Sequence, residues 1–218
     1  MWGIAFCFIP LIIAVLVFTF AFKLKFSHQL IAILLGLVAV FPISFIQYFL
    51  PGLPFLNNSP VLKILLESLI LYGFVEELLK MLLALPLPHK NYTTLNFLLL
   101  AFIMGLALGC FESVVYYFEH LQKANAKGAQ LLYGMIAARI FSSDIIHMCC
   151  MGLSGLYIYS KRLKKSHISY FIYAVLIHGV YDFFARFPNN LKWFSLAVVL
   201  LSIAECRIKY TGLQKDSE

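Results

Sequence analysis

Residues 94–118 read TLNFLLLAFIMGLALGCFESVVYYF, an apolar run of 25 residues whose one charged side chain is Glu112. A helix that crosses ~30 Å of hydrocarbon needs about 20 predominantly apolar residues. The run is therefore predicted to be a transmembrane helix. Six other segments qualify, or nearly qualify, as spans: 2–22, 29–50, 61–87, 130–160, 168–186 and 191–207.

The composition of the whole chain agrees with this reading. Of the 218 residues, 62% are hydrophobic and 12% are charged, against ~45–50% and ~25% in soluble domains. No polar stretch is long enough to build a separate aqueous domain. We therefore predict an all-α fold, a polytopic transmembrane helix bundle of about seven spans, forming a single domain over residues 1–218 in a cell membrane.

The net charge of +7 comes from basic residues spread over the loops beside the apolar runs. In such positions they set orientation and meet lipid head groups, so nucleic acid is not an expected partner. With seven spans, ten basic residues share one side with the C-terminus and four lie on the other. The positive-inside rule predicts an outer N-terminus and a cytoplasmic C-terminus.

Two of the predicted spans have unusual lengths. The segment 130–160 is longer than a span needs, so it is expected to be strongly tilted or broken near Ser142-Ser143. The segment 191–207 is short for a full crossing. The first apolar run has no basic region before it and no small-residue cleavage site, and we interpret it as a retained span.

Ionisable side chains inside these apolar segments mark a functional site. A charge in hydrocarbon costs about 2.5–3.5 kcal/mol even on a lenient scale, so such groups face one another, water or a substrate. On the segment 61–87, Glu76 and Lys80 share a helix face, while Glu77 points about 100° away. One carboxylate can then pair with the lysine while the other faces a cavity and exchanges protons.

The segment 94–118 carries Gly105, Gly109, Glu112 and Tyr116 at intervals of three or four residues, hence on one stripe of a helix. Small residues allow a neighbouring helix to approach closely. The stripe is expected to bring Glu112 against another span, and the span 61–87 is our candidate.

Two histidines each have a carboxylate on the same helix face. Asp144 and His147 are three residues apart, and His178 and Asp182 are four apart. A carboxylate at this spacing can orient an imidazole, or both groups can reach one water or metal. Arg139 is interpreted as a counter-charge. One cavity is predicted to be lined by Glu76, Glu112, His147, His178 and Asp182.

Taken in order on successive spans, these motifs resemble the PrsW family of intramembrane proteases, which is related to the CAAX-processing and Abi proteases. The motifs are Glu76-Glu77-x-x-Lys80, the segment from Gly105 to Tyr116 with Phe111-Glu112, His147, and His178-x-x-x-Asp182. The resemblance covers about residues 60–186. The wider CAAX pattern has arginine near Lys80, histidine for Glu112 and asparagine for Asp182, so that mechanism does not transfer residue by residue.

The resemblance implies hydrolysis of a peptide bond in a membrane-anchored, single-span protein, such as an anti-sigma factor, on the outer side of a bacterial plasma membrane. It implies that Glu76 is the general base, within a catalytic group of Glu76, Glu77, His147 and His178. Its supporting residues would be Lys80, Glu112 and Asp182. Two histidines and a glutamate are also the ligands of a catalytic zinc site, so a metal held by Glu76, His147 and His178 is the alternative.

Other functions remain open from the residues alone. Gly152-Leu153-Ser154-Gly155 matches the G-x-S-G of rhomboid serine proteases, with His178 on the next span. The H-E-x-x-H of zinc site-2 proteases and the G-x-G-D of presenilin-like proteases are absent. Buried carboxylates and histidines also form proton or ion pathways, so a small coupled transporter is the alternative from another class, followed by a catalytically silent scaffold.

Overall fold

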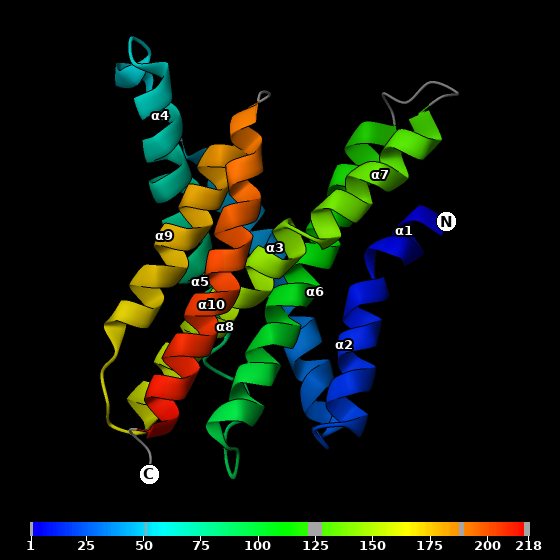
Figure 1. Ribbon diagram of the computed structural model, residues 1–218, viewed down its shortest axis with the longest axis vertical. Helices are drawn as coiled ribbons and strands as arrows, with labels where there is room; N and C mark the ends of the chain where they lie inside the picture. The colour runs from blue at the N-terminus through cyan, green and yellow to red at the C-terminus, as the bar shows by residue number, and fades with distance from the viewer. Residues whose placement is uncertain (1, 51, 122–127, 188–189, 216–218) are drawn as a thin grey trace.

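The computed structural model describes residues 2–50, 52–121, 128–187 and 190–215, and every regular element among them is a helix (Figure 1). The α-helices are α1 (Trp2–Cys7), α2 (Ile9–Phe20), α3 (Phe26–Phe49), α4 (Pro60–Leu66), α5 (Val75–Leu83), α6 (Thr94–Leu121), α7 (Gly128–Ile140), α8 (Ser143–Arg162), α9 (Ile168–Ala185) and α10 (Phe194–Lys215). Two 3-10 turns, η1 (Pro54–Leu56) and η3 (Asn190–Trp193), and a π-helix, η2 (Glu67–Phe74), complete them. The predicted all-α fold is confirmed.

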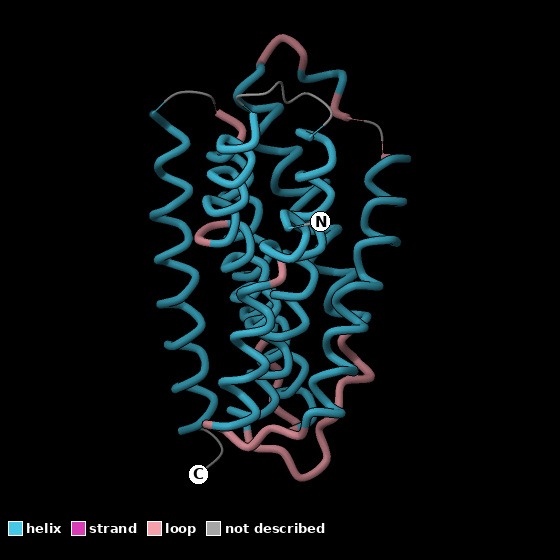
Figure 2. The backbone as a smooth tube through the Cα atoms, turned by 90° about the vertical axis from the view of Figure 1, so that its right-hand side faces the viewer, coloured by secondary structure: helices cyan, strands magenta, loops and turns pink. Residues whose placement is uncertain are grey.

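Four helical segments are long and apolar enough to cross a membrane: Phe26–Phe49, Thr94–Leu121, Leu131–Arg162 and Ile168–Ala185. They coincide with four of the predicted spans, and the protein is a multi-pass membrane protein. The other three predicted spans, 2–22, 61–87 and 191–207, are also helical over most of their length. That these segments cross as well, and the orientation of the termini, stay predictions. The helices run along the long axis of the molecule (Figure 2).

Helix α6 is the centre of the bundle, packed against α1, α2, α3, α7 and α8. Its close contacts depend on small residues. A Cβ at Gly36 of α3 would meet the carbonyl oxygen of Met104, and a Cβ at Gly105 would meet the carbonyl oxygen of His147 on α8. The glycine stripe of α6 therefore faces α8. The expectation that it faces the span 61–87 was wrong. The spacing of small residues along one helix predicts a close contact, but it does not predict which other helix makes that contact.

The long segment 130–160 is broken at the predicted place. Helix α7 ends at Ile140, and Ser142 leaves helical geometry with φ −132° and ψ −80° before α8 begins at Ser143. The Ser142 hydroxyl donates to the carbonyl of Ala138 at 2.7 Å, which satisfies a backbone group freed at the break. The break places Asp144 and His147 in the first turns of a new helix.

The π-helix η2 joins α4 to α5 and packs on α9. Gly73 and Gly179 allow this contact: a Cβ at Gly73 would lie 2.9 Å from the Val175 carbonyl oxygen, and a Cβ at Gly179 would lie 2.8 Å from Leu69 Cα. π-Helical turns are rare and are frequently found at functional sites. Here η2 immediately precedes the glutamate pair of α5.

Candidate active site

A cavity of about 400 Å³ lies between η2, α5, α6, α8 and α9. This volume is typical of a ligand or substrate site. All five residues predicted to share a cavity line it: Glu76, Glu112, His147, His178 and Asp182. That prediction is confirmed, and His178 is buried in the bundle with 2% of its surface exposed.

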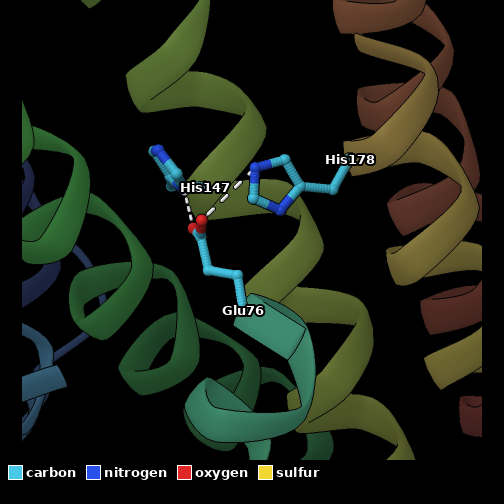
Figure 3. A group of neighbouring side chains, drawn as sticks. All are labelled: Glu76, His147 and His178. Atoms are coloured by element: carbon cyan, nitrogen blue, oxygen red, sulfur yellow. Dashed lines mark ion pairs between the residues drawn. The ribbon is translucent and has the colours of Figure 1, made fainter. Parts of the chain in front are cut away.

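Glu76, His147 and His178 converge at the buried wall of this cavity from three different helices (Figure 3). The carboxyl of Glu76 lies between the two imidazole rings, with Oε1 3.1 Å from His147 Nδ1 and 3.8 Å from His178 Nε2. One ligand atom from each residue lies within 4.8 Å of the others. Three side chains that could bind one ion thus face a single point.

Each imidazole forms a hydrogen bond with another carboxylate through the ring nitrogen that points away from Glu76. His147 Nε2 donates to Glu112 Oε2 at 2.8 Å, and His178 Nδ1 donates to Glu77 Oε1 at 2.7 Å. With these protons in place, a neutral imidazole would present the lone pair of His147 Nδ1 or His178 Nε2 on the side of Glu76. Carboxylates arranged in this way orient the histidine ligands of metal sites.

One buried and one partly buried cation complete the cluster. Lys80 is fully buried, with Nζ 2.5 Å from Glu77 and 3.4 Å from both Glu76 Oε1 and His147 Nδ1. Arg139 pairs with Glu112 at 2.7 Å and lies over the ring of Tyr116. As expected, one glutamate of the pair binds the lysine most closely while the other faces the cavity, and Arg139 is a counter-charge.

The donor set fits a divalent metal ion. Among the described residues, Oε1 of Glu76 is buried without a hydrogen-bond donor, because its approach to His147 lacks hydrogen-bond geometry. The groups joined to the trio by ion pairs or hydrogen bonds carry more negative than positive charge. The carboxylates are Glu76, Glu77, Glu112, Asp144 and Asp182, and the cations are Lys80 and Arg139. Two histidines and a glutamate are a ligand set found in catalytic zinc sites.

The same-helix carboxylates do not orient the histidines. Asp182 Oδ2 lies 3.7 Å from His178 Nε2, too far for a hydrogen bond, and Asp144 accepts from the Ser113 hydroxyl at 3.1 Å. The expectation that a same-helix carboxylate orients each imidazole was therefore wrong, while the alternative, that both groups of a pair reach one water or metal, stays a prediction. Spacing along one helix brings a carboxylate near the ring, but Glu77 and Glu112 reach the far nitrogens across helix interfaces.

The cavity residues that the sequence did not predict include Gln47 of α3, Tyr72 of η2 and Arg186, which follows α9 directly. Arg186 had a signal, since it lies eight residues after His178, on the same stripe as Asp182. Gln47 stands in a largely apolar helix, where Ser44 is the polar residue at helical spacing and no ionisable residue lies at that spacing. Its role depends on the fold.

The serine of the rhomboid-like motif is outside the cavity. Ser154 is fully buried in α8, seven residues beyond His147. The adjacent glycines pack on α6: a Cβ at Gly155 would lie 2.5 Å from Ala101 Cβ, and one at Gly152 would meet the ring of Phe102. The motif G-x-S-G here is explained by close helix packing.

Comparison with protein families agrees with this site. The model of the PrsW family intramembrane metalloproteases matches residues 25–204, which include the whole cluster. No curated protein and no solved structure matches the chain. Because the match covers most of the sequence, the chain belongs to the PrsW family of intramembrane metalloproteases.

Proposed function

We propose that this protein hydrolyses a peptide bond of a membrane-anchored protein in the cavity around Glu76, with the help of a metal ion. The observation that carries the proposal is the convergence of Glu76, His147 and His178 on one point of a cavity lined by polar side chains inside a membrane protein. Membership of a family of intramembrane proteases supports the same reaction class.

In this proposal Glu76, His147 and His178 hold the ion. A bound divalent metal would polarise the peptide carbonyl and lower the pKa of a water molecule. Glu112 and Glu77 keep the imidazole rings in the orientation that presents His147 Nδ1 and His178 Nε2 to the site. We therefore assign Glu77, expected to be catalytic, a positioning role behind the cavity wall, where it is fully buried.

The remaining side chains divide two tasks. Asp182 faces the cavity, with Oδ2 3.7 Å from His178 Nε2, and its carboxylate is placed to accept a proton from the attacking water. Arg139 is fixed by Glu112 and by the Ser113 and Ser143 hydroxyls, so its guanidinium stays beside the cavity as a source of positive charge for a developing oxyanion.

A transport function is not favoured. A proton or ion pathway needs polar groups through both halves of the membrane. On α8, the residues that follow His147 include the fully buried apolar side chains of Met151, Leu153 and Leu156. The ionisable groups form one compact cluster, as hydrolysis requires.

For the substrate we propose a single-span protein, such as a membrane-bound anti-sigma factor, cut near the outer face of a bacterial plasma membrane. This rests on the family resemblance and on the predicted orientation. We also retain the relation to the CAAX-processing and Abi proteases as an inference from the ordered motifs.

The test is cleavage of a single-span substrate by the purified protein in proteoliposomes. Glu76→Gln preserves size while removing the carboxylate, and it should lower the cleavage rate by on the order of 10²-fold or more. The matched control Ser154→Ala should cleave like the wild type. A chelator should abolish cleavage and added metal should restore it.

Three outcomes would change the account. Loss of cleavage in Ser154→Ala with retention in Glu76→Gln would establish a serine protease. Chelator resistance with loss in Glu76→Gln would make Glu76 the general base of a metal-free enzyme. Glu76-dependent proton leakage without any cleavage would refute the protease proposal.

A further inference from the structure

The cavity extends along one stripe of α9. His178, Asp182 and Arg186 follow one another at intervals of four residues, and all three line the cavity. At a rise of 1.5 Å per residue, the step from His178 to Arg186 is about 12 Å along the helix axis. Arg186 thus lies at the end of the cavity near α4, remote from the trio.

The guanidinium of Arg186 is only partly engaged. It donates to the Tyr72 hydroxyl at 3.1 Å and to Glu67 Oε2 at 3.4 Å, and it lies over the Tyr72 ring at 4.6 Å. Its side chain is 35% exposed. Guanidinium has five N–H donors in a planar fork suited to a carboxylate. Among the described residues, the contacts with Tyr72 and Glu67 use two of these five donors.

Glu67 does not neutralise this end of the cavity. Its carboxylate also accepts from the Leu53 backbone N–H at 3.1 Å and lies 4.0 Å from Lys63 Nζ. One carboxylate is therefore shared by two cations, Lys63 and Arg186, of which Arg186 lines the cavity. The inner end around Glu76 has more carboxylates than cations.

The two ends belong to one cavity, since Glu76 and Arg186 both line it. A second cavity of about 70 Å³, lined by Glu67 and Gly52, has Gln47 and Tyr72 in common with the main one. A stretched peptide placed along the main cavity would pass Arg186. At about 3.3 Å per residue, 12 Å corresponds to three or four residues.

We infer that Arg186 is a specificity-determining residue that binds an acidic side chain of the substrate, three or four residues from the scissile bond. The acidic residue lies on the side of the cut that faces the C-terminal end of α9. The inference rests on the proposed function, since it assumes that the scissile bond is placed at the Glu76, His147 and His178 trio. It adds a charge preference that neither the family match nor the metal geometry implies.

The experiment measures kcat/KM in proteoliposomes for a set of single-span substrates. Each member carries Asp, Asn or Lys at one position within five residues of the cut, on either side. The readout for each enzyme is kcat/KM for the Asp substrate divided by kcat/KM for the Asn substrate. This ratio does not depend on the basal activity of a variant. A partly exposed ion pair at the upper end of the usual range contributes about fivefold.

Wild-type enzyme should favour Asp about fivefold at the third or fourth position on one side of the cut. Arg186→Gln should bring the ratio close to one, and Arg186→Glu should favour Lys at the same position. Lys192→Gln is the matched control, since it removes a cation from η3, just before α10, outside the cavity, and it should keep the wild-type ratio.

Two results would overturn the inference. One is a wild-type ratio near one at every position, and the other is an Asp preference that persists in Arg186→Gln. Because the first result is obtained with the wild-type enzyme, the inference stays testable even if an Arg186 variant fails to fold. Failure of the proposed function looks different: the wild type would then cleave no member of the set, the uncharged substrates included.

Discussion

Lys80 provides a stringent test of the electrostatics of this site. It is the largest polar side chain with no exposed surface, and its ammonium group lies 2.5 Å from Glu77 and 3.4 Å from Glu76. Lys80→Met removes the charge and retains most of the volume. Both carboxylates then lose their nearest cation in a segment where they have little access to water.

The expected cost follows from burial. Removing one member of a buried ion pair costs about 3–5 kcal/mol, because the remaining charge is left uncompensated. For a chain of this size that corresponds to a decrease in Tm of about 6–20 °C. The matched control is Lys63→Met, whose 4.0 Å pair with Glu67 is partly exposed and should contribute at most about 1 kcal/mol.

The assay is thermal unfolding of the purified protein in detergent, with a chelator in every sample so that bound metal does not offset the loss. The double variant Lys80→Met/Glu77→Gln removes both members of the closest pair and should recover part of the stability. If Lys80→Met lowers Tm no more than Lys63→Met does, the burial and pairing of Lys80 described here are wrong.

Two further substitutions test the orientation of the ligands and the packing behind them. Glu77→Gln weakens the acceptor for His178 Nδ1 and should lower metal affinity about 10–100-fold, measured by competition with a fluorescent chelator; an unchanged affinity would show that Glu77 does not position His178. Gly105→Ala puts a Cβ 2.7 Å from Met151 Cβ and should cost about 1–3 kcal/mol of stability, whereas Gly134→Ala, with open space around it, should be neutral or slightly stabilising in the same unfolding assay.

Much of the fold could be predicted because apolar length and charge cost are local properties of the sequence. The all-α bundle, four of the membrane-spanning helices and the break near Ser142 follow from hydrophobicity and from small polar residues. The membership of the cavity follows from the cost of charge in hydrocarbon, which leaves Glu76, His147 and His178 no stable place except against one another.

The partners across helix interfaces could not be predicted. The hydrogen-bond acceptor for His178 is Glu77, 101 positions earlier in the chain, although Asp182 is its neighbour on the same helix face. The choice depends on how closely η2 and α9 approach at Gly73 and Gly179. The relative position of η2 and α9 is a property of two packed surfaces, and it cannot be predicted from the periodicity along one helix.

The central claim is that Glu76, His147 and His178 together hold the metal ion of this protease, and the most direct measurement is the metal content per chain of the purified full-length protein. Elemental analysis should find about one divalent ion per chain in the wild type and in Ser154→Ala. The variant His147→Ala/His178→Ala, checked for folding by its circular dichroism spectrum, should contain almost none. An unchanged metal content in that variant, or full cleavage by metal-free wild-type protein, would contradict the account.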